Sequence, residues 1–197
     1  FREMIAQPYG IVLVVGPTGS GKTTTLHAAL AQLNTPDMKI LTVEDPVEIV
    51  QPGLRQVQVN HRIGLGFAEV LRSFLRADPD VIMVGEMRDR TTAAVGIEAS
   101  LTGHLVLSTL QANSAPETLT RLIGMDIDTM SFADALRGVL SQRLVRRLCE
   151  HCRAPHTPTP EEWQQIGDAY GDDAFAAMMG QRDTEPRTYR PVGCARC

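Results

Sequence analysis

The stretch Gly16-Pro17-Thr18-Gly19-Ser20-Gly21-Lys22-Thr23 decides the fold of this chain. It matches in full the pattern of a phosphate-binding loop, in which two spaced glycines are followed by a lysine and a serine or threonine. An apolar run, Ile11 to Val15, precedes the loop, and a segment with helical periodicity follows it. Because this order of strand, loop and helix is the context that the pattern requires, the sequence predicts nucleotide binding here.

The residue types of this loop suit the binding of phosphate groups. Its glycines let backbone N–H groups point inward around a phosphate, and the helix that starts near Lys22 adds the positive end of its dipole. The Lys22 ammonium can reach the β- and γ-phosphates, and the Thr23 hydroxyl can bind Mg²⁺. The residues expected to contact the nucleotide are Gly16, Pro17, Thr18, Gly19, Ser20, Gly21, Lys22, Thr23 and Thr24.

The composition describes a globular chain with an aliphatic core. Of 197 residues, 43% are hydrophobic but only 5% are aromatic. The net charge of −4 provides no overall attraction for nucleic acid. No apolar run approaches the roughly 20 residues that a membrane-spanning helix needs. The chain begins at Phe1 rather than at methionine, so we expect it to be a fragment of a longer protein.

Strand-like and helix-like segments alternate up to about residue 148, which predicts an α/β fold with a mainly parallel sheet and helices on both faces. The expected strands are Ile11–Val15, Lys39–Glu44, an edge strand with Val57 and Val59, Val81–Val84 and Leu105–Thr109. The expected helices are one with Leu26, Ala29, Leu30 and Leu33, one with Phe67, Val70, Leu71, Phe74 and Leu75, one from Asp89 or Thr91 to about Leu101, one starting with a capping box at Ser114, and a long one with Phe132, Leu136, Val139, Leu140 and Leu144 that ends near Leu148.

The composition changes near residue 148, and we place a domain boundary there. Residues 1–148 are the expected core, and residues 149–197 the expected small subdomain. The proline-rich segment Ala154–Pro160 indicates a loop or hinge, and Thr159 starts another predicted helix. The tail from Gly180 is polar and rich in arginine.

Two predicted strands end in acidic residues. Glu44 ends the second strand, and Glu86 follows the strand Val81–Val84. In parallel sheets ligands lie beyond the carboxyl ends of the strands, and phosphoryl transfer to water needs Mg²⁺ and a carboxylate that orients the water. Glu44 and Glu86 are the candidates for these two tasks. In the second of these strand-end segments, Gly85 stands where an aspartate is usual, which leaves Glu86 as its only carboxylate.

The four cysteines form two C-x-x-C pairs, Cys149 with Cys152 and Cys194 with Cys197. Four thiolates at this spacing can close a tetrahedral structural Zn²⁺ site. Two unrelated pairs, or disulfides in a secreted protein, remain the alternatives. His151 and His156 could substitute as ligands, although with four cysteines present we expect both histidines to lie outside the ligand set.

The motifs in this order resemble the secretion ATPases that power type II secretion and type IV pilus assembly. The matching stretches are Gly16–Thr23, Thr42–Glu48 (the family's Asp box), Asp78–Asp89 (its atypical Walker B segment, with Gly85) and Ala99–Leu110 (its His box). With the cysteines, the resemblance covers almost the whole chain. The four-cysteine module is typical of the assembly and secretion members rather than of pilus retraction ATPases.

The resemblance implies a RecA-like P-loop core that assembles as a homo-hexamer and hydrolyses ATP, preceded by a separate domain that is absent here. It implies that Lys22 and Thr23 hold phosphate and metal, that Glu44 and Glu86 serve magnesium binding and water activation, and that His104 senses the γ-phosphate. It also implies a cytoplasmic location, peripheral to the inner membrane through platform proteins of the secretion or pilus system. Nucleic acid is not an expected partner.

The chain departs from the family at Gln111, where a second histidine is usual. Glutamine can position water or a phosphate by hydrogen bonds, but it cannot take up a proton. Arg72 and Arg76 resemble a family segment near subunit contacts, although a solvated helix arginine is the alternative for both. Arg143, Arg146 and Arg147 are expected on one face near the end of the long helix.

Two other functions remain open at this point. Gln111 and the single carboxylate after the strand Val81–Val84 would also suit a nucleotide-gated regulatory subunit with little turnover. A RecA-like nucleic-acid translocase shares the P-loop, but the chain lacks a basic stripe with stacking aromatic residues.

Overall fold

A six-stranded sheet, in which every neighbouring pair is parallel, forms the centre of the first of two units, Phe1–Leu144 and Val145–Cys197. The computed structural model describes residues 1–171 and 188–197. The strand order is β3-β2-β4-β5-β1-β6. The strands are β1 (Gly10–Val15), β2 (Ile40–Glu44), β3 (Arg55–Gln58), β4 (Val81–Val84), β5 (Leu105–Leu110) and β6 (Leu136–Ser141).

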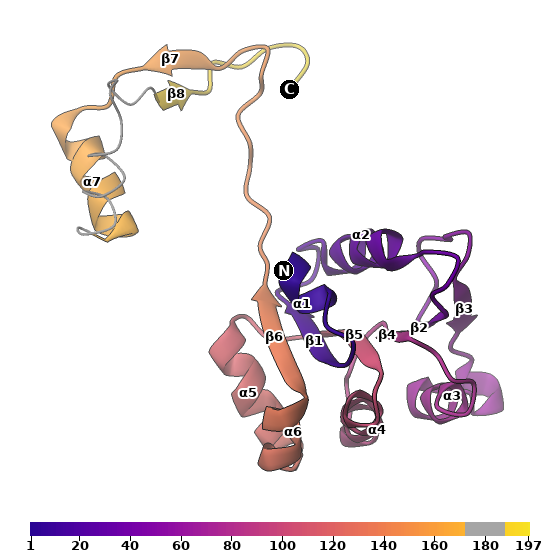
Figure 1. Ribbon diagram of the computed structural model, residues 1–197. Coiled ribbons are helices and arrows are strands. Elements are labelled where there is room, and N and C mark those ends of the chain that lie inside the picture. Colours follow the sequence, from indigo (N-terminus) through magenta and orange to yellow (C-terminus); the bar gives the residue numbers. More distant parts are fainter. Residues whose placement is uncertain (172–187) are drawn as a thin grey trace. The chain divides into compact units, whose positions relative to one another are not determined.

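Helices cover both faces of the sheet (Figure 1). The helices of this unit are α1 (Arg2–Ile5), α2 (Lys22–Leu33), α3 (Phe67–Phe74), α4 (Arg90–Leu101), α5 (Ala115–Gly124) and α6 (Thr129–Ala135), with a short 3-10 helix at His61–Ile63. Alternate side chains of β1 enter opposite layers. Val12 and Val14 pack with α1 and α2, while Ile11, Leu13 and Val15 pack with the layer of α3, α4, α5 and α6.

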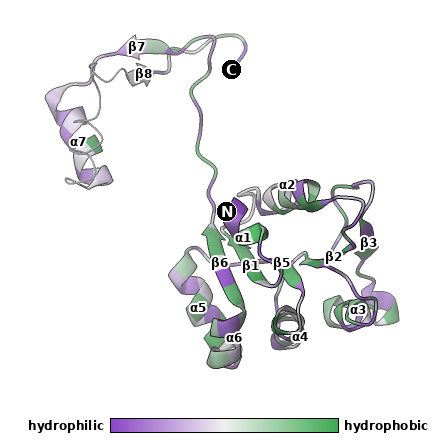
Figure 2. Ribbon diagram, in the orientation of Figure 1, coloured by the Kyte–Doolittle hydropathy of each residue, from purple (hydrophilic) through white to green (hydrophobic). Residues whose placement is uncertain are grey.

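This arrangement confirms the predicted α/β class and the mainly parallel sheet. The central strand β1 is hydrophobic along its length in Figure 2, and both β1 and β5 are buried throughout, because parallel strands covered on both faces expose neither row of side chains. The predicted edge strand near Val57 is also confirmed: β3 pairs with β2 only, and its first and last residues, Arg55 and Gln58, are exposed. Across the described residues, no helix is both long and apolar enough to cross a membrane.

The predicted long helix from Phe132 to Leu148 is wrong. Helix α6 ends at Ala135, and the chain continues as β6, which pairs in parallel with β1. Apolar residues at positions 136, 139 and 140 fit a helical period, but β1 leaves a row of N–H and C=O groups that only another strand can pair. Gly138 also disfavours a helix by about 1 kcal/mol relative to alanine. Tertiary pairing therefore overrides the local pattern.

The expected arginine face on this helix is wrong for the same reason. After β6 the described chain has no helix until α7 (Pro160–Tyr170). Arg143 instead donates a hydrogen bond to the Asn113 carbonyl at 2.8 Å, and Arg147 pairs with Glu150.

The helix start at Ser114 is confirmed, with one difference in detail. The Ser114 hydroxyl accepts from the Glu117 N–H at 3.2 Å. The Glu117 carboxylate accepts from the N–H of Asn113, at 2.7 Å, rather than from that of Ser114. The reciprocal half of the capping box is therefore displaced by one residue.

The second unit contains a two-stranded antiparallel sheet, β7 (Ala154–His156) with β8 (Thr188–Arg190), and helix α7. The expected loop Ala154–Pro160 thus contains a strand. Pro155 is tolerated there because both strands of a two-stranded sheet have an outer edge, where a missing N–H breaks no ladder. The predicted start of α7 is confirmed by a complete capping box between Thr159 and Glu162. The tail from Gly180 is predicted to be polar, and its residues 180–187 lie outside the described residues.

Asp89, one of two predicted caps, is the residue that caps α4. Its carboxylate accepts from the N–H and the hydroxyl of Thr92, both at 2.9 Å. Asp89→Ala is expected to lower the free energy of unfolding by about 1 kcal/mol, measured by urea denaturation. Thr91→Ala is the control, because Thr91 is exposed inside the first turn; it should change stability by less than about 0.5 kcal/mol. Equal losses would contradict the cap at Asp89.

Candidate functional site

The loop Gly16–Gly21 connects the carboxyl end of β1 to the amino end of α2. Its backbone requires glycine: Gly19 and Gly21 have φ of 76° and 85°, in the left-handed region. The Lys22 ammonium donates to the carbonyls of Gly16 and Pro17, each at 3.0 Å, and so lies across the mouth of the loop. The loop therefore has the shape and the charge expected of a phosphate cradle.

A pocket of about 570 Å³ lies where this loop meets the ends of the neighbouring strands. A volume of this size suits a nucleotide-sized ligand. Its lining includes Thr18, Gly19, Gly21, Lys22, Thr23 and Thr24 from the loop and α2, Glu44, Asp45 and Glu48 after β2, Glu86 and Arg88 after β4, and Thr109 and Gln111 at the end of β5. The fold thus brings the predicted loop and both predicted acids together.

Glu44 is the buried acid of the pocket, with 3% of its surface exposed. One carboxylate oxygen accepts from the Thr42 hydroxyl at 2.7 Å and the Gln56 amide at 2.9 Å. The other lies 3.1 Å from His27 Nε2. A carboxylate offers about four acceptor positions, so these partners fix its orientation and leave one position for a further donor.

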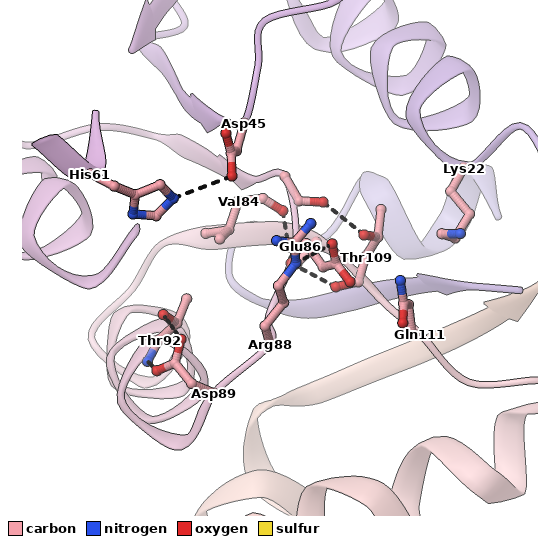
Figure 3. Close-up of polar contacts among 12 residues, drawn as sticks. Lys22, Asp45, His61, Val84, Glu86, Arg88, Asp89, Thr92, Thr109 and Gln111 are labelled. Atoms are coloured by element: carbon pink, nitrogen blue, oxygen red, sulfur yellow. Dashed lines mark hydrogen bonds and ion pairs between the residues drawn. The ribbon is translucent and has the colours of Figure 1, made fainter. Parts of the chain in front are cut away.

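Glu86 is the accessible acid, and Arg88 holds it (Figure 3). Arg88 Nε donates to a Glu86 oxygen at 2.7 Å, and the two side chains are 59% and 17% exposed. The preceding residue, Gly85, accepts a hydrogen bond from the Thr109 hydroxyl at 2.7 Å. A Cβ at Gly85 would lie 3.2 Å from the Val43 carbonyl oxygen, tighter than ordinary contact, so β2 and β4 leave little room there for an aspartate.

His104 is not brought to the pocket. It precedes β5, whereas the loop follows β1, and the two strands are parallel with Gly10 beside Leu105. The six residues of β5 therefore separate His104 from the loop edge by roughly 20 Å. His104 Nδ1 lies 2.9 Å from the Ala99 carbonyl and closes the end of α4. The expectation that His104 senses the γ-phosphate of nucleotide bound by its own chain disagrees with this placement.

Gln111 does reach the pocket, at the opposite end of β5. Figure 3 places its side chain beside Lys22 and across from Glu86, where an amide can donate to or accept from a phosphate or a water. Arg72 pairs with Glu69 of its own helix at 3.6 Å, and Arg76 is exposed. Neither arginine lines the pocket.

Two residues of the site were missed from the sequence. His27, buried on α2, orients Glu44, and Gln142, just after β6, contacts the loop. No motif marks either residue. Gln142 would have drawn notice only if β6 had been recognised as a strand beside β1.

In the second unit, the ligand atoms of Cys149, Cys152, Cys194 and Cys197 all lie within 4.8 Å of one another. The Sγ atom of Cys197 is 3.6 Å from that of Cys152 and 3.8 Å from that of Cys194. A tetrahedral site with Zn–S bonds of about 2.3 Å has sulfurs about 3.8 Å apart, so these thiols fit a metal ion. All four are free, and a disulfide would need about 2.05 Å.

The thiols differ in their acidity. Desolvation, followed by hydrogen bonding with the neighbouring thiols, raises the pKa of Cys152 to about 11. The Arg196 N–H, by contrast, lowers the pKa of Cys194. A bound cation would favour the thiolate at every position, since metal ligation displaces the thiol proton.

A family model described as "Type II/IV secretion system protein" matches residues 1–197. The chain is 49% identical over 197 residues to the type IV pilus assembly ATPase PilB of Thermus thermophilus, covering 100% of this chain and 21% of that protein. It is 55% identical over 196 residues to the putative type II secretion system protein E of Escherichia coli strain K12, covering 100% of this chain and 37% of that protein.

Among solved structures, the pilus retraction motor PilT with bound ADP matches with a TM-score of 0.65 at 31% identity, over 91% of this chain and 56% of that chain. The chain spans between about a fifth and little more than a third of the length of the two relatives above. Since the family model covers every residue, the chain belongs to the type II/IV secretion system protein family.

Proposed function

We propose that this chain carries the ATP-hydrolysing part of a motor that powers type II protein secretion or type IV pilus assembly. The observation that carries the proposal is one pocket lined by most of the P-loop, without Gly16, Pro17 and Ser20, and by two strand-end carboxylates. Its relatives are named as an assembly ATPase and a secretion protein, and the similar structure of PilT contains ADP. The proposed ATPase core is residues 1–148, and the proposed metal-binding subdomain residues 149–197.

In this mechanism the loop binds the phosphates and the strand ends act on the attacking water. Loop N–H groups and Lys22 hold the phosphate oxygens, with Thr18 and Thr24 at the rim. Mg²⁺, where bound, neutralises phosphate charge, and Thr23 and Glu86 are the residues that would hold it. Glu44, already oriented by three partners, has one acceptor position left for a water. Arg88 takes one acceptor position of the Glu86 carboxylate and leaves the others for a metal ion or a water.

The proposed working form is a homo-hexamer at the cytoplasmic face of the inner membrane, bound there through platform proteins. Exposed arginines such as Arg72 and Arg76 are then available to a neighbouring subunit, where a guanidinium can stabilise transferred phosphate charge. A regulatory subunit with little turnover is the second candidate. It is favoured by the Glu86–Arg88 ion pair, which holds the accessible acid in a paired state.

Lys22→Ala is expected to lower ATP turnover by about 10²- to 10³-fold, because it removes a fixed positive charge from the phosphates. The measurement is phosphate release with Mg²⁺ at increasing protein concentration, and turnover per chain should rise with concentration if subunits complete the site. Lys39→Ala is the matched control, because Lys39 precedes β2 at the opposite end of the sheet. Parental turnover in Lys22→Ala would refute the loop assignment. Tight ATP binding without turnover in the unchanged chain would favour the regulatory subunit.

Comparing Glu86→Gln with Glu44→Gln separates the two acids. Each is expected to lower the turnover number by about 10²- to 10⁴-fold, because amides neither take up a proton nor ligate Mg²⁺ well. Only the variant of the metal ligand, which we assign to Glu86, should also need more Mg²⁺ for half-maximal rate. The measurement is a Mg²⁺ titration of turnover at saturating ATP. A raised Mg²⁺ requirement in Glu44→Gln alone would reverse the assignment.

Zn²⁺ is the metal proposed for the four thiols. Cys149→Ser is expected to lower the zinc content of the purified protein well below about one ion per chain and to lower its melting temperature, because three thiolates no longer close the site. Zinc is measured by plasma mass spectrometry. His151→Ala should retain parental zinc if the histidine lies outside the ligand set. Equal zinc in Cys149→Ser and the parent would contradict the site.

A further inference from the structure

Gln142 makes three hydrogen bonds around the phosphate-binding loop. Its N–H donates to the Val15 carbonyl at 2.8 Å, and its side-chain amide donates to the Ser20 carbonyl at 2.6 Å. Its side-chain oxygen accepts from the Thr25 hydroxyl at 2.7 Å. One residue therefore binds the end of β1, the turn of the loop and the first turn of α2.

The packing at Gln142 also explains the need for a glycine at position 16 of the motif. A Cβ at Gly16 would lie 2.2 Å from the Gln142 carbonyl oxygen, a distance that no real side chain tolerates. A Cβ at Gly21 would lie 2.9 Å from the Gln142 side-chain nitrogen. The loop thus lies directly against residue 142, and Gly16 lets the two backbones approach.

We propose that Gln142 is a positioning residue that holds the phosphate-binding loop in its nucleotide-ready shape. The Ser20 carbonyl belongs to the loop that is expected to bind the phosphates, and Thr25 lies in the turn that begins with Lys22. Binding both groups limits the conformations that the loop samples. A ligand then meets N–H groups that are already ordered, and loses less entropy on binding. The consequence for nucleotide affinity rests on the proposed function, whereas the consequence for loop order does not.

The first test uses hydrogen exchange of the full chain without nucleotide. Gln142→Met keeps the length and most of the volume of the side chain and removes its two hydrogen bonds. We expect the amides of residues 18–25 to exchange at least about fivefold faster, the factor for one lost hydrogen bond of ordinary strength. Gln32→Met is the matched control, because Gln32 is exposed on the same helix, α2.

The second test measures affinity for ADP by calorimetry. Gln142→Met should weaken ADP binding by about tenfold, with the melting temperature close to that of Gln32→Met. Thr25→Val removes one partner hydroxyl and should weaken binding less, whereas Thr25→Ser keeps the hydroxyl and should bind as the parent does. Gln142→Met combined with Thr25→Val should bind no more weakly than Gln142→Met alone, because both changes remove the same bond.

The outcomes separate the two proposals. Faster loop exchange in Gln142→Met but not in Gln32→Met supports the positioning role, whether or not the parent hydrolyses ATP. Unchanged loop exchange overturns it, as does exchange that rises equally across the sheet, which would mark a general loss of stability. A parent that binds neither ADP nor ATP would defeat the proposed function, while the exchange result still decides the role of Gln142.

Discussion

The parallel pairing of β1 on both of its edges is the constraint on which the rest of the structure depends. β1 lies between β5 and β6, and its register places Val15 beside Leu110 of one strand and Ser141 of the other. The segments that follow these three strands therefore emerge at one edge of the sheet. They are the phosphate-binding loop, Gln111 and Gln142, and their emergence on one side follows from the parallel direction and the register of the strands.

The two acids of the pocket differ in burial and, as a result, in the number of groups that contact them. Glu44 ends a strand inside the sheet and is surrounded by the donors Thr42 and Gln56 and by His27, which lock its carboxylate in one orientation. Glu86 stands beyond its strand, partly in solvent, with one charged partner. A buried carboxylate needs its hydrogen bonds to remain charged, whereas an exposed ion pair exchanges readily with water. The first is suited to holding a geometry, and the second to changing partners.

The unit that contains the cysteine cluster depends less on a hydrophobic core than the first unit does. The second unit has a two-stranded sheet and one described helix, α7, with few buried residues, so apolar burial contributes less there than in the first unit. Four sulfurs held close together from both ends of the unit let one cation tie distant parts of the chain. Small units with little core commonly rely on such ligands.

The sequence by itself determined the fold class, the phosphate-binding loop, the strand-end acids and the cysteine pairs. These features are local: a glycine-rich turn, an apolar run and a C-x-x-C spacing express their chemistry within a few residues. Only the tertiary structure decided that residues 136–141 form a strand and that His104 lies at the end of the strands opposite to the loop. It also decided that Gln142 contacts the loop and that His27 contacts Glu44. Each of these depends on pairing between residues about 100 positions apart or on burial by another element. Neither kind of interaction can be recognised from the local sequence pattern.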